Sequence, residues 1–287
     1  MLVKLKTYTT IRFILLNKLL LVMKNIKIFI KNLSNLIHYL FSTLPSNNNF
    51  KLSHDKKLLN DFYSQSLEIE YKKDYSKYLK AFNLPENSGG INIGDQKALY
   101  FITKIHMPIR ILELGTHIGC STINFLIASQ NNKNFENLTT VDIVDVNDKK
   151  ISNWKKYHSS FSPKEMSEKI NMQDKITFVN DFTDNFLKKN EQKYNLIFID
   201  AGHSFDKAYK DLYLSTNFLE DDGIIIMHDI YQFKHFSFRK SYLNGPYLAL
   251  KKISKKFNFE INLLHSLPWR TKDEGNLTSL GILKLIK

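Results

Sequence analysis

Cysteine is almost absent from this chain of 287 residues, which contains only Cys120. A single cysteine excludes a disulfide bond within the chain and a zinc site built from several thiolates. This usage fits a reducing compartment, and we expect a cytoplasmic protein. The apolar fraction of 43% is ordinary for a globular protein, so a sizeable core can be buried.

Acidic residues are absent before Asp55, and this stretch contributes part of the formal net charge of +13. Basic residues in this first stretch are Lys4, Lys6, Arg12, Lys18, Lys24, Lys27, Lys31 and Lys51. Elsewhere the lysines often occur in pairs, such as Lys188-Lys189 and Lys251-Lys252, which is typical of solvated helix faces. We therefore expect no nucleic-acid partner.

An apolar run long enough to cross a membrane is also missing. Residues 10–41 are rich in Leu, Ile and Phe, but lysines interrupt every run before the roughly 18 residues of a span. Lys18 splits the apolar region, and no small-x-small cleavage site follows, so a signal peptide is disfavoured. Polar residues return every seven positions, which predicts a helix with one polar stripe. This helix either docks on the domain or on a second subunit of a homo-oligomer, or lies on the inner, anionic membrane face.

Three regions follow from the pattern. Residues 1–45 form the basic helical extension, and residues 46–88 form a lid and linker region that is helical over 55–82. Pro45–Asn49, at the junction of the two regions, has the composition of a linker. The main domain covers 89–287, starting with a short helix from Gly94 to about His106 with Asp95 as its N-cap.

The central feature is a strand, a glycine turn and a helix. An apolar run over 109–114 is followed by Gly115 and Gly119 and then by a segment with helical spacing. The Gly-Lys-Ser/Thr ending of a phosphate loop and the third glycine of a dinucleotide fingerprint are both absent. Glu113 in the last turn of the strand would repel a pyrophosphate but suits a ligand with an ammonium group.

The segment Leu-Glu-Leu-Gly-Thr-His-Ile-Gly-Cys-Ser-Thr resembles the first motif of class I S-adenosylmethionine-dependent methyltransferases. It is most similar to the branch with Glu-x-Gly-Thr-x-x-Gly-x-Ser-Thr, which includes small-molecule and sugar O-methyltransferases. The resemblance implies that the methyl donor binds at this turn. The donor-binding residues implied here are Glu113, Gly115, Thr116, Gly119 and Ser121.

Strands and helices alternate through the rest of the domain. The predicted strands are 109–114, 138–143, 176–180, 195–200, 223–228, 257–264 and 280–286. Predicted helices lie over 150–170, 182–189 and 204–218. The alternation predicts an α/β fold, a Rossmann-like doubly wound sheet of seven strands that is mostly parallel. The last two strands lack a helix between them, so we expect the final strand to be antiparallel.

Further donor contacts are expected at the strand ends. Asp142 ends the second strand, where the resemblance implies an acid that binds the ribose hydroxyls, with Asp145 as a competitor. Asp181 and Phe182 follow the third strand, where they could bind and stack on the adenine. Asp142 and Asp181 could instead be helix-capping acids.

A group of acids and histidines is predicted at the ends of the fourth and fifth strands. Asp200 and His203 occur in Asp-Ala-Gly-His-Ser-Phe, which resembles an Asp-x-x-His-Ser-Tyr segment of the same branch, and Asp200 lies beside the expected donor. His228 and Asp229 end the fifth strand, so the four side chains should converge. In one alternative Asp200 and Asp229, with His228, hold Mg²⁺ or another divalent cation that orients the acceptor hydroxyl, and His203 removes the proton. In the other there is no metal, and His203 is the general base, oriented by Asp229 or Asp200.

The segment 230–256 is expected to form an aromatic, basic loop over this site, suited to a sugar or phenol with a negative group, unless it packs on the N-terminal helices. We predict methyl transfer from S-adenosylmethionine to a hydroxyl of a small molecule, with a sugar or glycan precursor preferred. The rivals are a metal-dependent hydrolase or oxygenase built on the same cluster, and a non-catalytic scaffold of this fold that docks at membranes.

Overall fold

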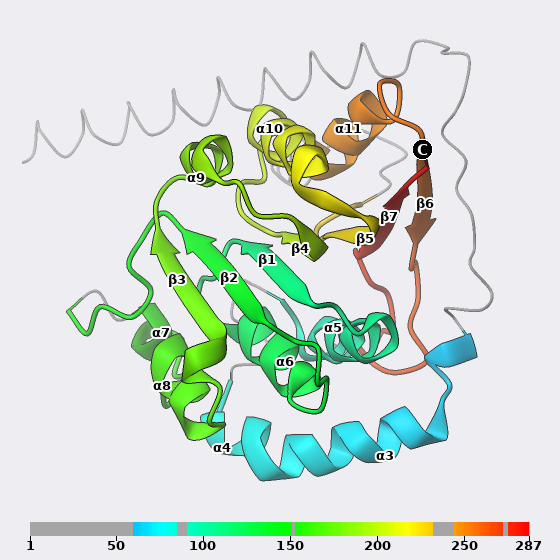
Figure 1. Cartoon of the computed structure of the whole chain (residues 1–287). Helices are drawn as coiled ribbons and strands as arrows, with labels where there is room; N and C mark the ends of the chain where they lie inside the picture. The colour runs from blue at the N-terminus through cyan, green and yellow to red at the C-terminus, as the bar shows by residue number, and fades with distance from the viewer. Residues whose placement is uncertain (1–59, 85–90, 151–152, 232–243, 272–274, 287) are drawn as a thin grey trace, which may run out of the picture.

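The computed structural model describes residues 60–84, 91–150, 153–231, 244–271 and 275–286, and these form one seven-stranded sheet covered by helices (Figure 1). The strand order is β3-β2-β1-β4-β5-β7-β6. The predicted helix over 10–41 and the aromatic residues of 232–243 lie outside the described residues.

All seven predicted strands are present, with bounds that differ by a few residues. β1 to β5 pair in parallel, and β7 pairs antiparallel with both β5 and β6. This confirms the predicted Rossmann-like sheet with an antiparallel last strand. The strands are β1 Arg110–Leu114, β2 Asn137–Asp142, β3 Ile176–Asn180, β4 Tyr194–Ile199, β5 Leu219–Met227, β6 Phe259–Leu263 and β7 Gly281–Leu285.

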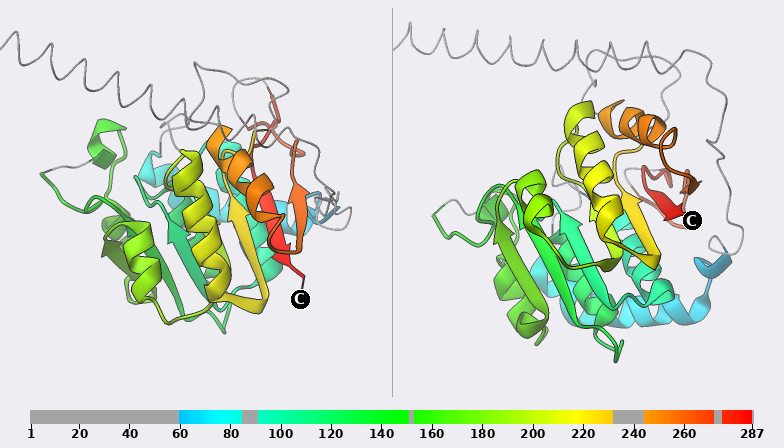
Figure 2. Two further views of the ribbon diagram at one scale, coloured as in Figure 1. Left: turned by 90° about the horizontal axis from the view of Figure 1, so that it is seen from above. Right: turned by 45° about the horizontal axis from the view of Figure 1, so that its top comes forward.

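Helices cover both faces of the sheet, as Figure 1 and the two turned views of Figure 2 show. On one side lie α5 Ile93–His106, α6 Cys120–Ser129, α7 Asn153–Lys156 and α8 Pro163–Lys169. On the other lie α9 Thr183–Lys189, α10 Phe205–Ser215 and α11 Asn244–Ile253. Short 3-10 turns precede β3 at Gln173–Lys175 and β5 at Thr216–Phe218.

Alternating strand residues divide the core between the two faces. Ile111 and Phe198 pack with α5 and α6, whereas Leu112 and Ile199 pack with α10 and α11. Because side chains along a strand point alternately to opposite faces, a strand buried on both sides needs a continuous apolar run. This is the pattern that made the central strands predictable.

The helical segment before the domain packs along α5. It consists of α3 Gln65–Asp74, a π-helical turn Tyr75–Leu79 and α4 Lys80–Phe82. Asp74 accepts a 2.7 Å hydrogen bond from the Tyr100 hydroxyl, and Lys104 forms an ion pair with Glu70. Most of this segment therefore forms an outer layer over α5, while its start at Phe62 and Tyr63 approaches Trp269 in the loop after β6.

Three local predictions were wrong. The single helix expected over 150–170 is broken into α7 and α8, because Ser162 caps a new helix with Pro163 in its first turn and Glu165 completing a capping box. The helix before β1 is capped by Asn92, which frees the Asp95 side chain. The end of the expected loop over 230–256 is helical, as α11.

No helix among the described residues is long and apolar enough to cross a membrane.

Candidate active site

Glu113 ties together the turn that follows β1. Its carboxylate is fully buried and accepts hydrogen bonds from the hydroxyls of Ser121, Thr122 and Thr140, the last two at 2.5 Å. Thr116 adds a 2.5 Å contact to Thr140. Burial raises the pKa of Glu113 to about 7, although the three hydroxyls oppose this shift. The expected contact of Glu113 with a donor ammonium group stays a prediction and requires the turn to open, since the carboxylate has no exposed surface.

Gly115 allows the backbones of the first and fourth strand ends to meet. Its φ is +104°, and a Cβ there would lie 2.4 Å from the Asp200 carbonyl oxygen. The Asp200 amide also donates to Leu114 O at 2.9 Å. Only glycine leaves room for this close approach of the two backbones. The contact therefore fixes the position of the Asp200 backbone relative to the glycine turn. Gly119, with φ +82°, is the N-cap of α6.

Asp142 lies at the end of β2 and holds the turn. It accepts from the His117 amide at 2.8 Å and from the Val144 amide at 3.1 Å. The Asp181 amide donates to the Asp142 carbonyl at 3.0 Å, so the predicted ribose and adenine residues lie on adjacent strand ends. The Asp181 side chain accepts from the Phe182 amide and the Asn185 side chain and forms an ion pair with Lys189. The N-cap of α9 is Phe182, without a side-chain cap, so Asp181 is not the capping residue of this helix.

Two large apolar side chains are exposed beside these acids. Ile143 is 59% exposed after β2, and Phe182 is 52% exposed after β3. Exposed apolar side chains at neighbouring strand ends, flanked by acceptors, suit a flat heterocycle such as adenine. Ile143 was not among the predicted residues, because inside an apolar strand pattern it could not be distinguished from a core residue.

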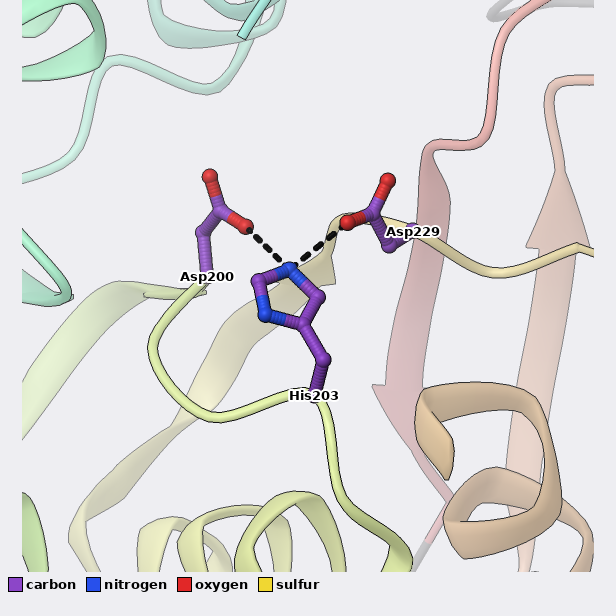
Figure 3. A group of neighbouring side chains, drawn as sticks. All are labelled: Asp200, His203 and Asp229. Atoms are coloured by element: carbon purple, nitrogen blue, oxygen red, sulfur yellow. Dashed lines mark ion pairs between the residues drawn. The ribbon is translucent and has the colours of Figure 1, made fainter. Parts of the chain in front are cut away.

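The predicted acids and histidines at the ends of β4 and β5 do converge, and Figure 3 shows three of them, Asp200, His203 and Asp229. His203 Nε2 lies 2.6 Å from Asp229 Oδ2 and 3.7 Å from Asp200 Oδ1. His228 Nδ1 lies between the same two carboxylates, 3.3 Å from Asp200 and 3.5 Å from Asp229. Asp229 adopts a left-handed conformation with φ 57°, which aspartate tolerates better than most residues.

The charges of this cluster are strongly coupled. Burial alone would lower the pKa of both histidines, but for His203 the hydrogen bond to Asp229 and the charges of Asp200 and Asp229 together outweigh burial, and the pKa is raised. For His228 the carboxylates of Asp200 and Asp229 outweigh burial and raise the pKa well above its usual value. Burial would raise the pKa of Asp229, yet the charge of His228 and the bond from His203 lower it to about 2. The buried ring of His228 therefore lies in surroundings that favour its protonated form.

A third carboxylate belongs to the cluster, and the sequence did not indicate it. Asp95, in the first turn of α5, is 1% exposed and lies 3.2 Å from His228 Nε2 through Oδ2. In the sequence Asp95 is an acid near the start of a predicted helix, and such an acid is usually interpreted as the N-cap.

The backbone of His203 is fixed by α11. A Cβ on Gly245 would lie 2.1 Å from the His203 carbonyl oxygen and 2.7 Å from the Phe205 amide nitrogen. The first turn of α11 therefore packs directly on the segment that carries His203.

A hollow of about 580 Å³ lies beside the N-terminus of α5. Trp269 lines this hollow, and its indole donates to Gly94 O at 2.9 Å. The wall of the hollow therefore contacts α5, the helix that carries Asp95. The lining residues are Tyr63, Ser266, Leu267, Pro268, Trp269, Arg270, Gly275 and Asn276.

Asp200, His203 and Asp229 could also hold a metal ion. One ligand atom of each lies within 4.8 Å of the others. His228, which the sequence suggested as a ligand with the two acids, instead directs Nδ1 at their oxygens and Nε2 at Asp95. The group of ligand atoms that come together therefore contains His203 in the place of His228, and a role of His228 as a ligand stays a prediction.

The order and directions of the seven strands are those of the class I S-adenosylmethionine-dependent methyltransferase fold. Residues 112–230, from β1 to just beyond Asp229, match the family described as "Methyltransferase domain". No curated protein matches the chain at a significant level.

Solved structures of methyltransferases share the fold. The O-methyltransferase from Bacillus cereus in complex with SAH is 14% identical, with a TM-score of 0.51 over 78% of this chain and 91% of that one. The O-methyltransferase TomG from Streptomyces achromogenes, involved in tomaymycin synthesis and in complex with SAM, is 12% identical, with a TM-score of 0.51 over 88% and 96%. SAH-bound Podospora anserina methyltransferase PaMTH1 is 17% identical, with a TM-score of 0.50 over 85% and 100%. At these identities the likeness establishes the fold.

Proposed function

We propose that this methyltransferase transfers the methyl group of S-adenosylmethionine to a hydroxyl of a small molecule. The observation that carries the proposal is the 2.6 Å contact between His203 and Asp229 at the edge where Asp200 meets the glycine turn. The bound donor supplies an electrophilic methyl group. A hydroxyl acceptor must then lose one proton, and a half-exposed histidine held by a carboxylate can take it.

The donor would lie across the strand ends. Asp142 offers carboxylate oxygens to the ribose hydroxyls, and Ile143 and Phe182 offer apolar surface to the adenine ring. The turn at Gly115 and Asp200 lies between these residues and His203, which suits the reacting end of the donor. In this arrangement the protein aligns the donor and acceptor and excludes water from the reacting atoms.

Asp229 orients His203 and stabilises the imidazolium that forms when the proton arrives. Because the pKa of His203 is raised above 6.5, the neutral base becomes the main form at a higher pH than for an ordinary histidine. We therefore expect the transfer rate to increase as the pH rises above 6.5 toward mildly alkaline values.

The acceptor would enter from the side of the hollow near α5. The aromatic rings of Tyr63 and Trp269 and the guanidinium of Arg270 favour a ring-shaped acceptor with a negative group. A sugar or glycan precursor with such a group remains the preferred class.

The test is incubation with methyl-labelled donor and fractionated small molecules from cells. The expected result is label in a small-molecule fraction, reduced on the order of a hundredfold in His203→Asn. His158→Asn is the matched control, because His158 is an exposed histidine on another loop. Donor affinity, measured by calorimetry, should be the same in all three proteins. Undiminished transfer by His203→Asn would rule out His203 as the base.

A divalent cation held by Asp200, His203 and Asp229 is the second candidate mechanism, favoured by the closeness of their ligand atoms. The cation would bind and acidify the acceptor hydroxyl. Chelation decides between the two. Full activity in excess EDTA supports the metal-free base, whereas loss of activity that Mg²⁺ or Mn²⁺ restores supports the cation.

A further inference from the structure

The carboxylate of Asp95 does not have the position of a helix cap, although the residue lies in the first turn of α5. The capping function belongs to Asn92, whose side-chain oxygen accepts from the Asp95 amide at 3.0 Å. The Asp95 carboxylate is turned inward and 1% exposed, and its Oδ1 has no hydrogen-bond partner among the described residues. A buried charge of this kind is costly unless it is paired.

The partner of Asp95 is His228, at the end of β5 and 133 residues away in the chain. Asp95 Oδ2 is 3.2 Å from Nε2, which leaves Nδ1 facing Asp200 and Asp229. Asn92 Nδ2 donates to the same Oδ2 at 2.7 Å, which fixes the carboxylate itself. The ring of His228 is thus clamped between the first turn of α5 and the two acids.

The carboxylates of Asp200 and Asp229 lie on either side of His228 Nδ1, at 3.3 Å and 3.5 Å. Asp229 in turn contacts His203 Nε2 at 2.6 Å through Oδ2. A continuous path therefore runs from α5 through His228 and Asp229 to His203.

We propose that Asp95 is a positioning residue that sets the orientation of His203 by acting through His228. The inference rests on the proposed methyl transfer for its functional meaning. The arrangement itself extends the site beyond residues 112–230, because α5 precedes the matched domain.

The first test needs no acceptor. Ring signals of the nine histidines are recorded by NMR, with His203 assigned through His203→Asn. Asp95→Ala should shift the His203 signal although the two side chains do not touch, and it should have no further effect in a His228→Asn background. Asp95→Asn keeps an acceptor oxygen and should leave the His203 signal close to that of the wild type.

Asp211→Ala is the matched control. Asp211 is also a fully buried aspartate on a helix with an oxygen that lacks a partner, but it contacts Thr183 and Lys207 instead. It should lower the melting temperature and leave the His203 signal unchanged. A His203 signal that is unmoved in Asp95→Ala overturns the proposal. If that variant does not fold, Asp95→Leu replaces it and is judged by the same criterion.

The second test is label transfer from methyl-labelled S-adenosylmethionine to the cell fraction that accepts it. Asp95→Ala should lower the rate about tenfold or more at unchanged donor affinity, and Asp95→Asn should recover most of it. Equal rates in Asp95→Ala and wild type overturn the proposal. A wild type that transfers no label would instead refute the proposed function, and the NMR test would still judge the role of Asp95.

Discussion

At the scale of single residues, Glu113 illustrates how a motif residue can serve the fold as well as a ligand. Its three hydroxyl donors come from α6 and β2, so its carboxylate joins the helix to the first two strands. The residue is fully buried and has no basic partner in the part of the chain that the structure describes, and burial raises its pKa to about 7 from the usual 4.5. The free energy of unfolding should therefore depend on its protonation.

We predict that Glu113→Gln removes a pH dependence of the unfolding free energy. Between pH 4.5 and about 7 the unfolded chain releases this proton while the folded protein keeps it, so the wild type loses stability as the pH rises. Relative to the wild type, the unfolding free energy of Glu113→Gln should increase by on the order of 3 kcal/mol between pH 4.5 and 7.5. Urea unfolding of the donor-free proteins measures it.

Glu165→Gln provides a control of opposite sign. The Ser162 amide lowers the pKa of Glu165, so the wild type gains stability relative to this variant as the pH rises through the acidic range. Parallel unfolding curves for wild type and Glu113→Gln across this range would contradict the assignment of the raised pKa to Glu113.

A second residue-scale prediction concerns donor binding. Asp142→Ala should weaken the binding of S-adenosylmethionine by about 1.5–3 kcal/mol, because it removes a charged acceptor and the brace of the His117 amide. Asp145→Ala is matched, since Asp145 is an exposed acid three residues on that accepts only from a loop amide. Calorimetry compares the two, and equal affinities would reject Asp142 as the ribose ligand.

At the scale of elements, the order of strands and helices was predictable and the long-range pairings were not. Continuous apolar runs such as Leu196–Ile199 are a local signal, so they identify buried strands directly. Ser162, Pro163 and Glu165 also carried a local helix-start signal, which the prediction of one long helix overlooked. The contact between Asp95 and His228 depends on how α5 crosses the sheet edge, which no local pattern encodes.

The contact between α11 and α10 leads to a third prediction. Gly245→Ala should lower the rate of label transfer by about tenfold or more, because the added Cβ pushes the His203 backbone away from Asp229. Donor affinity should change little, since the donor residues lie on other strand ends. Gly223→Ala is the control, because its Cβ would meet Leu219 and Glu220 within β5 and should affect stability alone. An unchanged rate in Gly245→Ala would show that the His203 segment adapts to the displacement.

At the scale of the whole molecule, the charge is distributed unevenly along the chain. No acid occurs before Asp55, whereas the acids of the described domain form the ion pairs and strand-end cluster described above. Lys18, Lys24 and Lys31 belong to the predicted polar stripe of residues 10–41. We propose that this stripe attracts the protein to an anionic membrane face, where each lysine contributes about 1 kcal/mol.

The prediction is that full-length protein sediments with anionic vesicles, less at high salt and little with neutral vesicles, because salt screens the attraction. Replacing Lys18, Lys24 and Lys31 by Glu should abolish sedimentation. The control variant carries three Lys→Glu replacements outside the extension, at Lys188 and Lys189 of α9 and Lys252 of α11. It changes the net charge by the same amount and should still sediment with anionic vesicles. If both variants lose vesicle sedimentation equally, the net charge rather than the extension is responsible for binding. If the wild type stays in solution with vesicles, and replacing Lys18, Lys24 and Lys31 changes the oligomeric state, the predicted helix docks on protein.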